Sequence, residues 1–143
     1  MLQLALALQA LSIPPGLPAP CVGTFQATAE RECPRFVFFD SGESEFRRDW
    51  ERELDAIAAR LQALPGSRLL LIGRSDASGP AGANLRISRA RATLVRDALV
   101  ARGVPLDRID LQATGENDLL VPTADGVREG QNRRVDMFLI LSR

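Results

Sequence analysis

The sequence contains no histidine, lysine or tyrosine. Histidine is the side chain whose ordinary pKa lies nearest neutral pH, and it is the commonest metal ligand. Its absence excludes a Ser-His-Asp triad, a Cys-His pair and a histidine-based metal centre. We therefore expect no metal site, no cofactor and no enzyme that depends on an imidazole base.

All 18 basic residues are arginine, and 18 acidic residues balance them to a net charge of zero. Without a global positive field to concentrate polyanions, nucleic acid is not an expected partner. The charges are nevertheless unevenly placed, because residues 30–55 are acidic overall and residues 73–102 are basic. The length of 143 residues and the 45% hydrophobic content fit one globular domain.

The first charged residue of the chain is Glu30. Residues 1–13 are mostly apolar, and four prolines follow before residue 21. A bilayer span needs about 20 apolar residues, so this run is too short, but its length is typical of a secretory signal. We expect residues 1–20 to be an export signal or its remnant. The alternative is a hydrophobic strand or helix of the mature fold.

The chain has two cysteines, Cys21 and Cys33. In an exported protein an oxidising compartment would allow them to form a disulfide that closes a short loop. Lipidation of Cys21 and a pair of inert thiols are the alternatives. We interpret residues 21–35 as a cysteine-containing linker and residues 36–143 as the folded domain.

Beyond residue 35, short apolar runs alternate with longer amphipathic stretches. The apolar runs predict strands at residues 36–39, 69–73, 109–114 and 135–141, and the other stretches predict helices at residues 44–63 and 84–102 with one turn at 128–132. This alternation predicts a layered α/β sandwich. The last strand is apolar on both faces, so we expect it to be central in the sheet.

The second predicted helix has a polar patch within its apolar face. The expected apolar stripe consists of Ile87, Leu94, Val95, Ala98 and Leu99, and it is interrupted by Asn84, Ser88 and Arg91. An unpaired buried charge costs several kcal/mol, so Arg91 needs an anionic partner. That partner is either an internal carboxylate, Asp76 or Asp136, or a carboxylate of a ligand.

The loop before this helix favours a ligand. Residues 73–79, with the sequence GRSDASG, follow the carboxyl end of a predicted strand, where α/β sheets usually bind ligands. Asp76 and Arg91 would then flank one pocket. A carboxylate can bind an ammonium and a guanidinium can bind a carboxylate with two hydrogen bonds. The pair therefore fits a zwitterion such as the head group of an amino acid.

Several separated motifs occur in a fixed order along the chain. They are Gly73-x-x-Asp76, Asn84, Ile87-Ser88-x-x-Arg91-Ala92, Gly103-Val104, Arg108-Ile109, Gly115-Glu116, Pro122 and Asn132-Arg133-Arg134-Val135-Asp136. In this order they resemble the OmpA-like C-terminal domain, which also occurs in the peptidoglycan-associated lipoprotein and in flagellar stator B-subunits. The resemblance covers residues 36–140. It implies a mixed sheet of about four strands with the helices packed on one side.

The resemblance also implies a function. Members of this family bind cell-wall peptidoglycan noncovalently through the meso-diaminopimelate of the stem peptide, and so tether the envelope or an envelope complex to the wall. By match, Asp76 binds the diaminopimelate amine and Arg91 binds its carboxylate. Further polar contacts match Ser75, Asn84, Asn132 and Arg134. The implied location is the periplasm, in association with the outer membrane or the cell wall, with an outer-membrane or envelope-complex protein as a partner.

Two other functions are compatible with the residues. A peptidoglycan hydrolase could use two carboxylates, Asp76 and Glu116, because glycosidases need only such a pair. Glu116 lies in a glycine-flanked turn, however, without apolar surroundings to raise its pKa. The other function is that of a protein-interaction module that does not bind the wall. We expect binding of the wall rather than catalysis.

Overall fold

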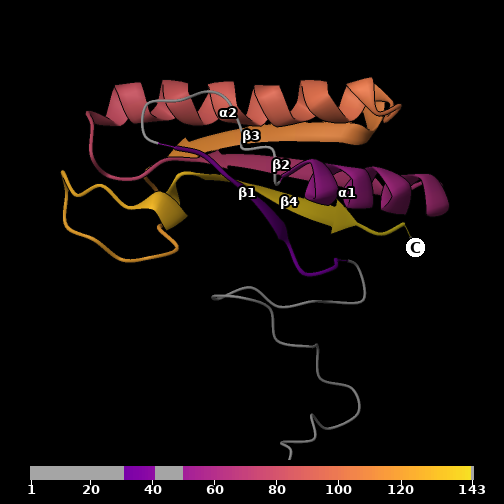
Figure 1. Ribbon diagram of the computed structural model, residues 1–143, viewed down its shortest axis with the longest axis horizontal. Coiled ribbons are helices and arrows are strands. Elements are labelled where there is room, and N and C mark those ends of the chain that lie inside the picture. The colour runs from indigo at the N-terminus through magenta and orange to yellow at the C-terminus, as the bar shows by residue number, and fades with distance from the viewer. Residues whose placement is uncertain (1–30, 41–49, 143) are drawn as a thin grey trace, which may run out of the picture.

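The computed structural model describes residues 31–40 and 50–142, and these form one mixed sheet with two helices (Figure 1). The strands are β1 (Arg35–Phe38), β2 (Arg68–Arg74), β3 (Ile109–Gly115) and β4 (Arg134–Ile140). The helices are α1 (Glu51–Ala63) and α2 (Ala81–Ala101), and two short 3-10 helices are η2 (Leu106–Arg108) and η3 (Gly130–Asn132). The predicted α/β fold is confirmed.

The strand order in the sheet is β1-β4-β2-β3. The last strand, β4, pairs antiparallel with both β1 and β2, while β2 and β3 are parallel. The sheet is therefore mixed, as the family resemblance implies. The predicted central position of the last strand is also confirmed, because β4 lies between β1 and β2.

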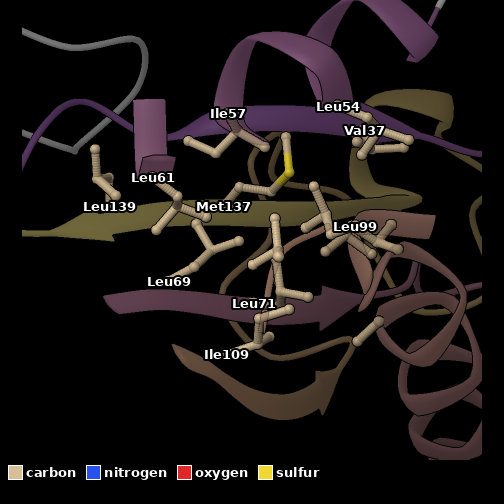
Figure 2. Packing of buried hydrophobic residues seen from close by; sticks show 14 of the residues in the cluster. Val37, Leu54, Ile57, Leu61, Leu69, Leu71, Leu99, Ile109, Met137 and Leu139 are labelled. Carbon is tan, nitrogen blue, oxygen red and sulfur yellow. The ribbon is translucent and has the colours of Figure 1, made fainter. Parts of the chain in front are cut away.

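Both helices pack on the same face of the sheet. Side chains alternate between the two faces of a strand, and Leu71 and Met137 are among those on the helical face (Figure 2). They form one core with Leu54, Ile57 and Leu61 of α1 and with Ala92, Val95 and Leu99 of α2. The predicted two-layer arrangement therefore follows from the alternation of apolar residues in the strands.

Helix α2 begins one turn earlier than the sequence predicts. Pro80 is the N-cap, with φ −60° and ψ 145°, and its carbonyl oxygen accepts a hydrogen bond from the N–H of Asn84 at 2.9 Å. A proline at the start of a helix loses no hydrogen bond, because the first N–H groups have no partner within the helix. The predicted first helix is observed from Glu51 onward, and its residues 44–49 lie outside the described residues.

The buried face of α2 differs from the predicted apolar stripe at one position. Ile87 is 37% exposed, whereas the next residue, Ser88, is fully buried. The reason is a close approach of α2 to β2 at Gly73. A Cβ atom on Gly73 would lie 1.8 Å from the carbonyl oxygen of Ser88. The absence of a side chain at Gly73 therefore brings the polar side of α2 toward the sheet and leaves Ile87 at the surface.

The end of the predicted linker lies against the sheet. Arg31 forms a β-bridge with Ile140, and the N–H of Glu32 donates to the carbonyl oxygen of Leu139 at 3.2 Å. Cys33 is not a free thiol, but its predicted partner Cys21 lies outside the described residues, so their pairing stays a prediction. Residues 1–20, the predicted export signal, also lie outside. No helix in the described part of the chain is long and apolar enough to cross a membrane.

Candidate ligand-binding site

Asp76 and Arg91 lie at the same end of the sheet, where β2 ends and α2 begins. Asp76 follows β2 by two residues and is 4% exposed, and Arg91 is 2% exposed on the buried face of α2. The Nη1 of Arg91 donates to the carbonyl oxygen of Arg74 at 3.2 Å, which holds the guanidinium against the last residue of β2. The two residues that the sequence singles out therefore belong to one cluster.

Neither of the two internal salt bridges considered for Arg91 is formed. Within residues 31–40 and 50–142, no carboxylate forms an ion pair with Arg91, and its Nε is buried without a hydrogen-bond partner. The guanidinium carbon lies 5.4 Å from the centre of the Phe39 ring, which is a cation–π contact. Arg91 is therefore a buried cation that lacks an anionic partner among the described residues.

The charge state of Arg91 is affected by burial and by its neighbours. Desolvation and the positive charge of Arg133 lower the pKa of Arg91 to about 10, and the negative charge of Asp76 partly opposes this change. At neutral pH the guanidinium remains protonated. It can therefore bind a carboxylate with charge-assisted hydrogen bonds in a site that largely excludes water.

Four donors surround the carboxylate of Asp76. The N–H and the hydroxyl of Ser78 donate to Oδ1 at 3.2 and 2.6 Å. The N–H of Glu129 and the Nη1 of Arg133 donate to Oδ2 at 3.3 and 3.0 Å. Burial by itself would raise the pKa of Asp76, but these hydrogen bonds outweigh it and hold the pKa below the ordinary value of 3.8. The carboxylate is therefore ionised at neutral pH.

Arg133 is a member of this cluster that the sequence analysis did not single out. Its Nη1 bonds to Asp76, and its Nε donates to the carbonyl oxygen of Phe39 at 3.1 Å. The motif Asn132-Arg133-Arg134 pointed to this part of the chain, but the family resemblance assigned the ligand contact to Arg134. The two arginines are adjacent, and only the direction of β4 determines which of them reaches the site.

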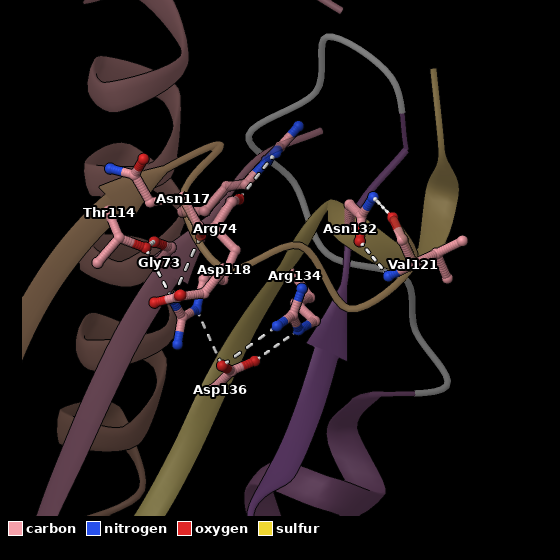
Figure 3. A network of polar contacts seen from close by, with 10 residues as sticks. Gly73, Arg74, Thr114, Asn117, Asp118, Val121, Asn132, Arg134 and Asp136 are labelled. Atoms are coloured by element: carbon pink, nitrogen blue, oxygen red, sulfur yellow. Dashed lines mark hydrogen bonds and ion pairs between the residues drawn. The ribbon is translucent and has the colours of Figure 1, made fainter. Parts of the chain in front are cut away.

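Arg134 lies on the other face of the sheet, in a buried network with Asp136 (Figure 3). Its Nε donates to Oδ1 of Asp136 at 2.7 Å, and the Nε of Arg74 donates to Oδ2 at 3.0 Å. Arg74 also bonds to Thr114 and Asp118, at 3.0 and 3.2 Å. Desolvation lowers the pKa of Arg134. This network joins β2, β3 and β4 and accounts for Asp136 being unavailable to Arg91.

The remaining three predicted residues have partners within the loops. The hydroxyl of Ser75 donates to the carbonyl oxygen of Asp76 at 2.9 Å, and the Nδ2 of Asn84 donates to the carbonyl oxygen of Gly79 at 2.9 Å. Asn132 accepts from the N–H of Val121 at 2.9 Å and donates to its carbonyl oxygen at 2.8 Å (Figure 3). These side chains hold the loops that carry Asp76 and Arg133, next to Arg91 on α2.

A cavity of about 360 Å³ adjoins the cluster on the side of Arg133. It is lined by Phe38, Phe39, Asp40, Trp50, Glu129, Gly130, Gln131 and Arg133. The described residues contain no group of three side chains arranged to hold a metal ion. The lowered pKa of Asp76 also disfavours it as the proton donor of a hydrolase, which needs a raised pKa. The arrangement is suited to holding one carboxylate and one ammonium.

Comparisons with known proteins agree with this fold. The model of the OmpA family matches residues 38–133. The chain is 34% identical over 128 residues to the peptidoglycan-binding protein ArfA of Mycobacterium tuberculosis, a match that covers 88% of this chain and 39% of ArfA. It is 31% identical over 106 residues to the probable lipoprotein YiaD of Escherichia coli K12, which covers 74% of this chain and 48% of YiaD. The chain thus spans less than half of each of these relatives.

Solved structures with the same fold include two envelope proteins. The peptidoglycan-associated lipoprotein from Burkholderia pseudomallei has a TM-score of 0.69 and 28% identity, over 73% of this chain and 89% of that one. The cell wall anchor of the T6SS from Pseudomonas aeruginosa has a TM-score of 0.65 and 24% identity, over 80% of this chain and 85% of that one. Because the identity to the T6SS anchor is below 25%, this second similarity supports the fold alone.

Proposed function

This chain belongs to the OmpA family, and we propose that it binds cell-wall peptidoglycan noncovalently through the meso-diaminopimelate of the stem peptide. The observation that carries the proposal is Arg91, a buried guanidinium with no carboxylate partner among the described residues. A buried charge without a partner is costly and is retained where a ligand supplies the partner. The related ArfA, which is named a peptidoglycan-binding protein, supports the choice of ligand.

The chemistry of diaminopimelate fits the cluster. The side chain of this residue ends in a carbon that bears an ammonium and a carboxylate. Arg91 binds the carboxylate, and Asp76 binds the ammonium. Two charge-assisted contacts to groups on one carbon fix the orientation of the ligand as well as its affinity. Lysine, which replaces diaminopimelate in some cell walls, has the ammonium without the carboxylate and would leave Arg91 unpaired.

The position of the site within the domain is suited to a tether. Arg31 pairs with Ile140 at the end of β4, whereas the site lies beyond the start of β4, near Arg133. A strand of this length separates the two by about 20 Å. The wall would therefore be bound at the end of the sheet opposite Arg31, and we propose a protein of the outer membrane or of an envelope complex as the partner. The names of its relatives, which include a probable lipoprotein and an outer membrane protein A, support the further proposal that the protein acts in the periplasm.

Co-sedimentation with purified sacculi tests the proposal. The protein should sediment with walls that contain meso-diaminopimelate and should remain in solution with walls that contain lysine at that position. Arg91→Met and Asp76→Asn should each abolish sedimentation, because each removes one of the two charged contacts. Arg96→Met is the matched control, since Arg96 lies on the outer side of α2 and pairs with Asp97.

The same experiment separates the two other functions. Release of soluble fragments from the sacculi would indicate a hydrolase. Folded wild-type protein that ignores diaminopimelate walls would contradict the proposal and favour an interaction module. Sedimentation of Arg91→Met at the wild-type level would contradict the assignment of the site while leaving wall binding in place.

A further inference from the structure

The carboxylate of Asp76 has no vacant position for another donor. An ionised carboxylate offers about four lone-pair positions. The N–H and hydroxyl of Ser78 occupy those of Oδ1, and the N–H of Glu129 with the Nη1 of Arg133 occupy those of Oδ2. A ligand ammonium that binds Asp76 must therefore displace a donor that is already there.

Arg133 is the donor most readily displaced. The N–H groups of Ser78 and Glu129 belong to the backbone, and the hydroxyl of Ser78 is neutral. The guanidinium of Arg133 is at the end of a flexible side chain, and its positive charge repels an incoming ammonium. The side chain is 15% exposed, compared with 5% for that of Asp76, so it lies on the solvent side of the pair.

We propose that Arg133 is an internal counter-cation that occupies the ammonium position on Asp76, and that a ligand ammonium binds by displacing it. This inference rests on the proposed function, because it concerns the same site. The exchange replaces one positive charge on Asp76 by another, so Asp76 keeps a cationic partner throughout. Arg133 therefore lowers the affinity for every ligand that uses Asp76, because its ion pair with Asp76 must be broken first.

The adjoining cavity provides a place for the displaced guanidinium. Arg133 forms part of the wall of the 360 Å³ cavity, which also has the carboxylates of Asp40 and Glu129 in its lining. A cation that leaves Asp76 would move toward other negative groups without leaving the protein surface. Among the described residues, the Arg133 side chain makes one other hydrogen bond, from its Nε to the carbonyl oxygen of Phe39. That bond is the further contact that the exchange would alter.

Removal of the counter-cation should strengthen binding of the ligand. In isothermal titration calorimetry with free meso-diaminopimelate, Arg133→Gln should bind about fivefold to tenfold more tightly than the wild type, because no ion pair has to be broken first. Arg133→Lys should restore wild-type affinity, since it keeps a cation beside Asp76. Arg128→Gln is the control for loss of a positive charge, because Arg128 is an exposed residue of the same loop.

Wild-type protein gives a second measurement that does not depend on the stability of a variant. In NMR spectra the Nε–H resonance of Arg133 should shift on addition of meso-diaminopimelate. Pimelate, the same seven-carbon diacid without the two amines, should leave that resonance unchanged. A resonance unaffected by saturating diaminopimelate, or equal or weaker binding by folded Arg133→Gln, would overturn the inference. Failure of the wild type to bind either diaminopimelate or sacculi would instead overturn the proposed function.

Discussion

Arg133 and Arg134 are neighbours in the chain, yet they bind carboxylates on opposite sides of the sheet. The Nη1 of Arg133 lies 3.0 Å from Oδ2 of Asp76, and the Nε of Arg134 lies 2.7 Å from Oδ1 of Asp136. Adjacent side chains of an extended chain point in opposite directions. One arginine therefore belongs to the candidate ligand site, and the other belongs to the network that joins three strands. This separation makes the two roles testable independently.

Arg91→Met should raise the stability of the protein while it abolishes wall binding. Arg91 is buried and has no ionic partner in the described part of the chain. Its replacement by an apolar side chain of similar length removes a desolvation cost, so we expect a gain of about 1 kcal/mol or more. Thermal unfolding followed by circular dichroism measures the change. Arg96→Met, at a partly exposed position of the same helix, should leave the melting temperature nearly unchanged. A lower melting temperature for Arg91→Met would show that the Arg74 and Phe39 contacts outweigh the desolvation of Arg91.

Asp76→Asn should lose stability at neutral pH and lose much less in acid. The pKa of Asp76 is lowered in the folded state, so its contribution is fully present above the ordinary value of 3.8 and is lost as the pH falls through the folded pKa. The difference in unfolding free energy between the wild type and Asp76→Asn should therefore be constant from pH 7 to about pH 4 and shrink below that. Urea unfolding at several pH values measures it. An equal difference at pH 7 and pH 2.5 would contradict the lowered pKa.

Asp136→Asn should destabilise the fold strongly. Asp136 is fully buried between two arginines. Removal of its charge leaves Arg134 without an ion-pair partner among the described residues and leaves Arg74 with only the exposed Asp118. Breaking a buried ion pair on one side costs roughly 3 kcal/mol or more. Asp110→Asn is the matched control, because Asp110 also pairs with an arginine of β2, Arg68, but at the surface. Exposed ion pairs contribute little, so equal melting temperatures for the two variants would contradict this account.

Gly73→Ala should destabilise the protein and displace the helix that carries Arg91. The added methyl group would lie 1.8 Å from the carbonyl oxygen of Ser88, and backbone atoms cannot move aside unless α2 moves. We expect a loss of about 3 kcal/mol or more, as for severe overpacking, together with weaker wall binding. In the control Gly82→Ala the nearest neighbour of the new methyl group is the Nη1 of Arg86 at 3.8 Å. That variant should melt at or above the wild-type temperature, because alanine favours the helix. Equal melting temperatures would mean that α2 adapts without cost.

The elements of the fold could be predicted from the sequence because each depends on local pattern. Four apolar runs became four strands with bounds that differ by at most about one residue, and the apolar nature of residues 135–141 was enough to place β4 in the centre. The start of α2 was missed by one turn because the small residues after Pro80 have no apolar periodicity, and helix start there depends on the proline backbone. The exposure of Ile87 was missed because it depends on the contact between Gly73 and Ser88, which is remote in sequence.

The sequence by itself determined that Asp76 and Arg91 lie near each other. An arginine within an apolar stripe requires an anion, and the loop that carries Asp76 connects the end of a strand to the helix that carries Arg91. Only the tertiary structure decided which carboxylate pairs with which arginine. Asp76, Asp136, Arg74, Arg91, Arg133 and Arg134 could be paired in several ways from the sequence. Side-chain direction in β4 and β2 assigns Asp136 to Arg74 and Arg134, and assigns Asp76 to Arg133. For this reason Arg91 has no ionic partner within residues 31–40 and 50–142. No local pattern contains that result, since it depends on distances between residues far apart in the chain.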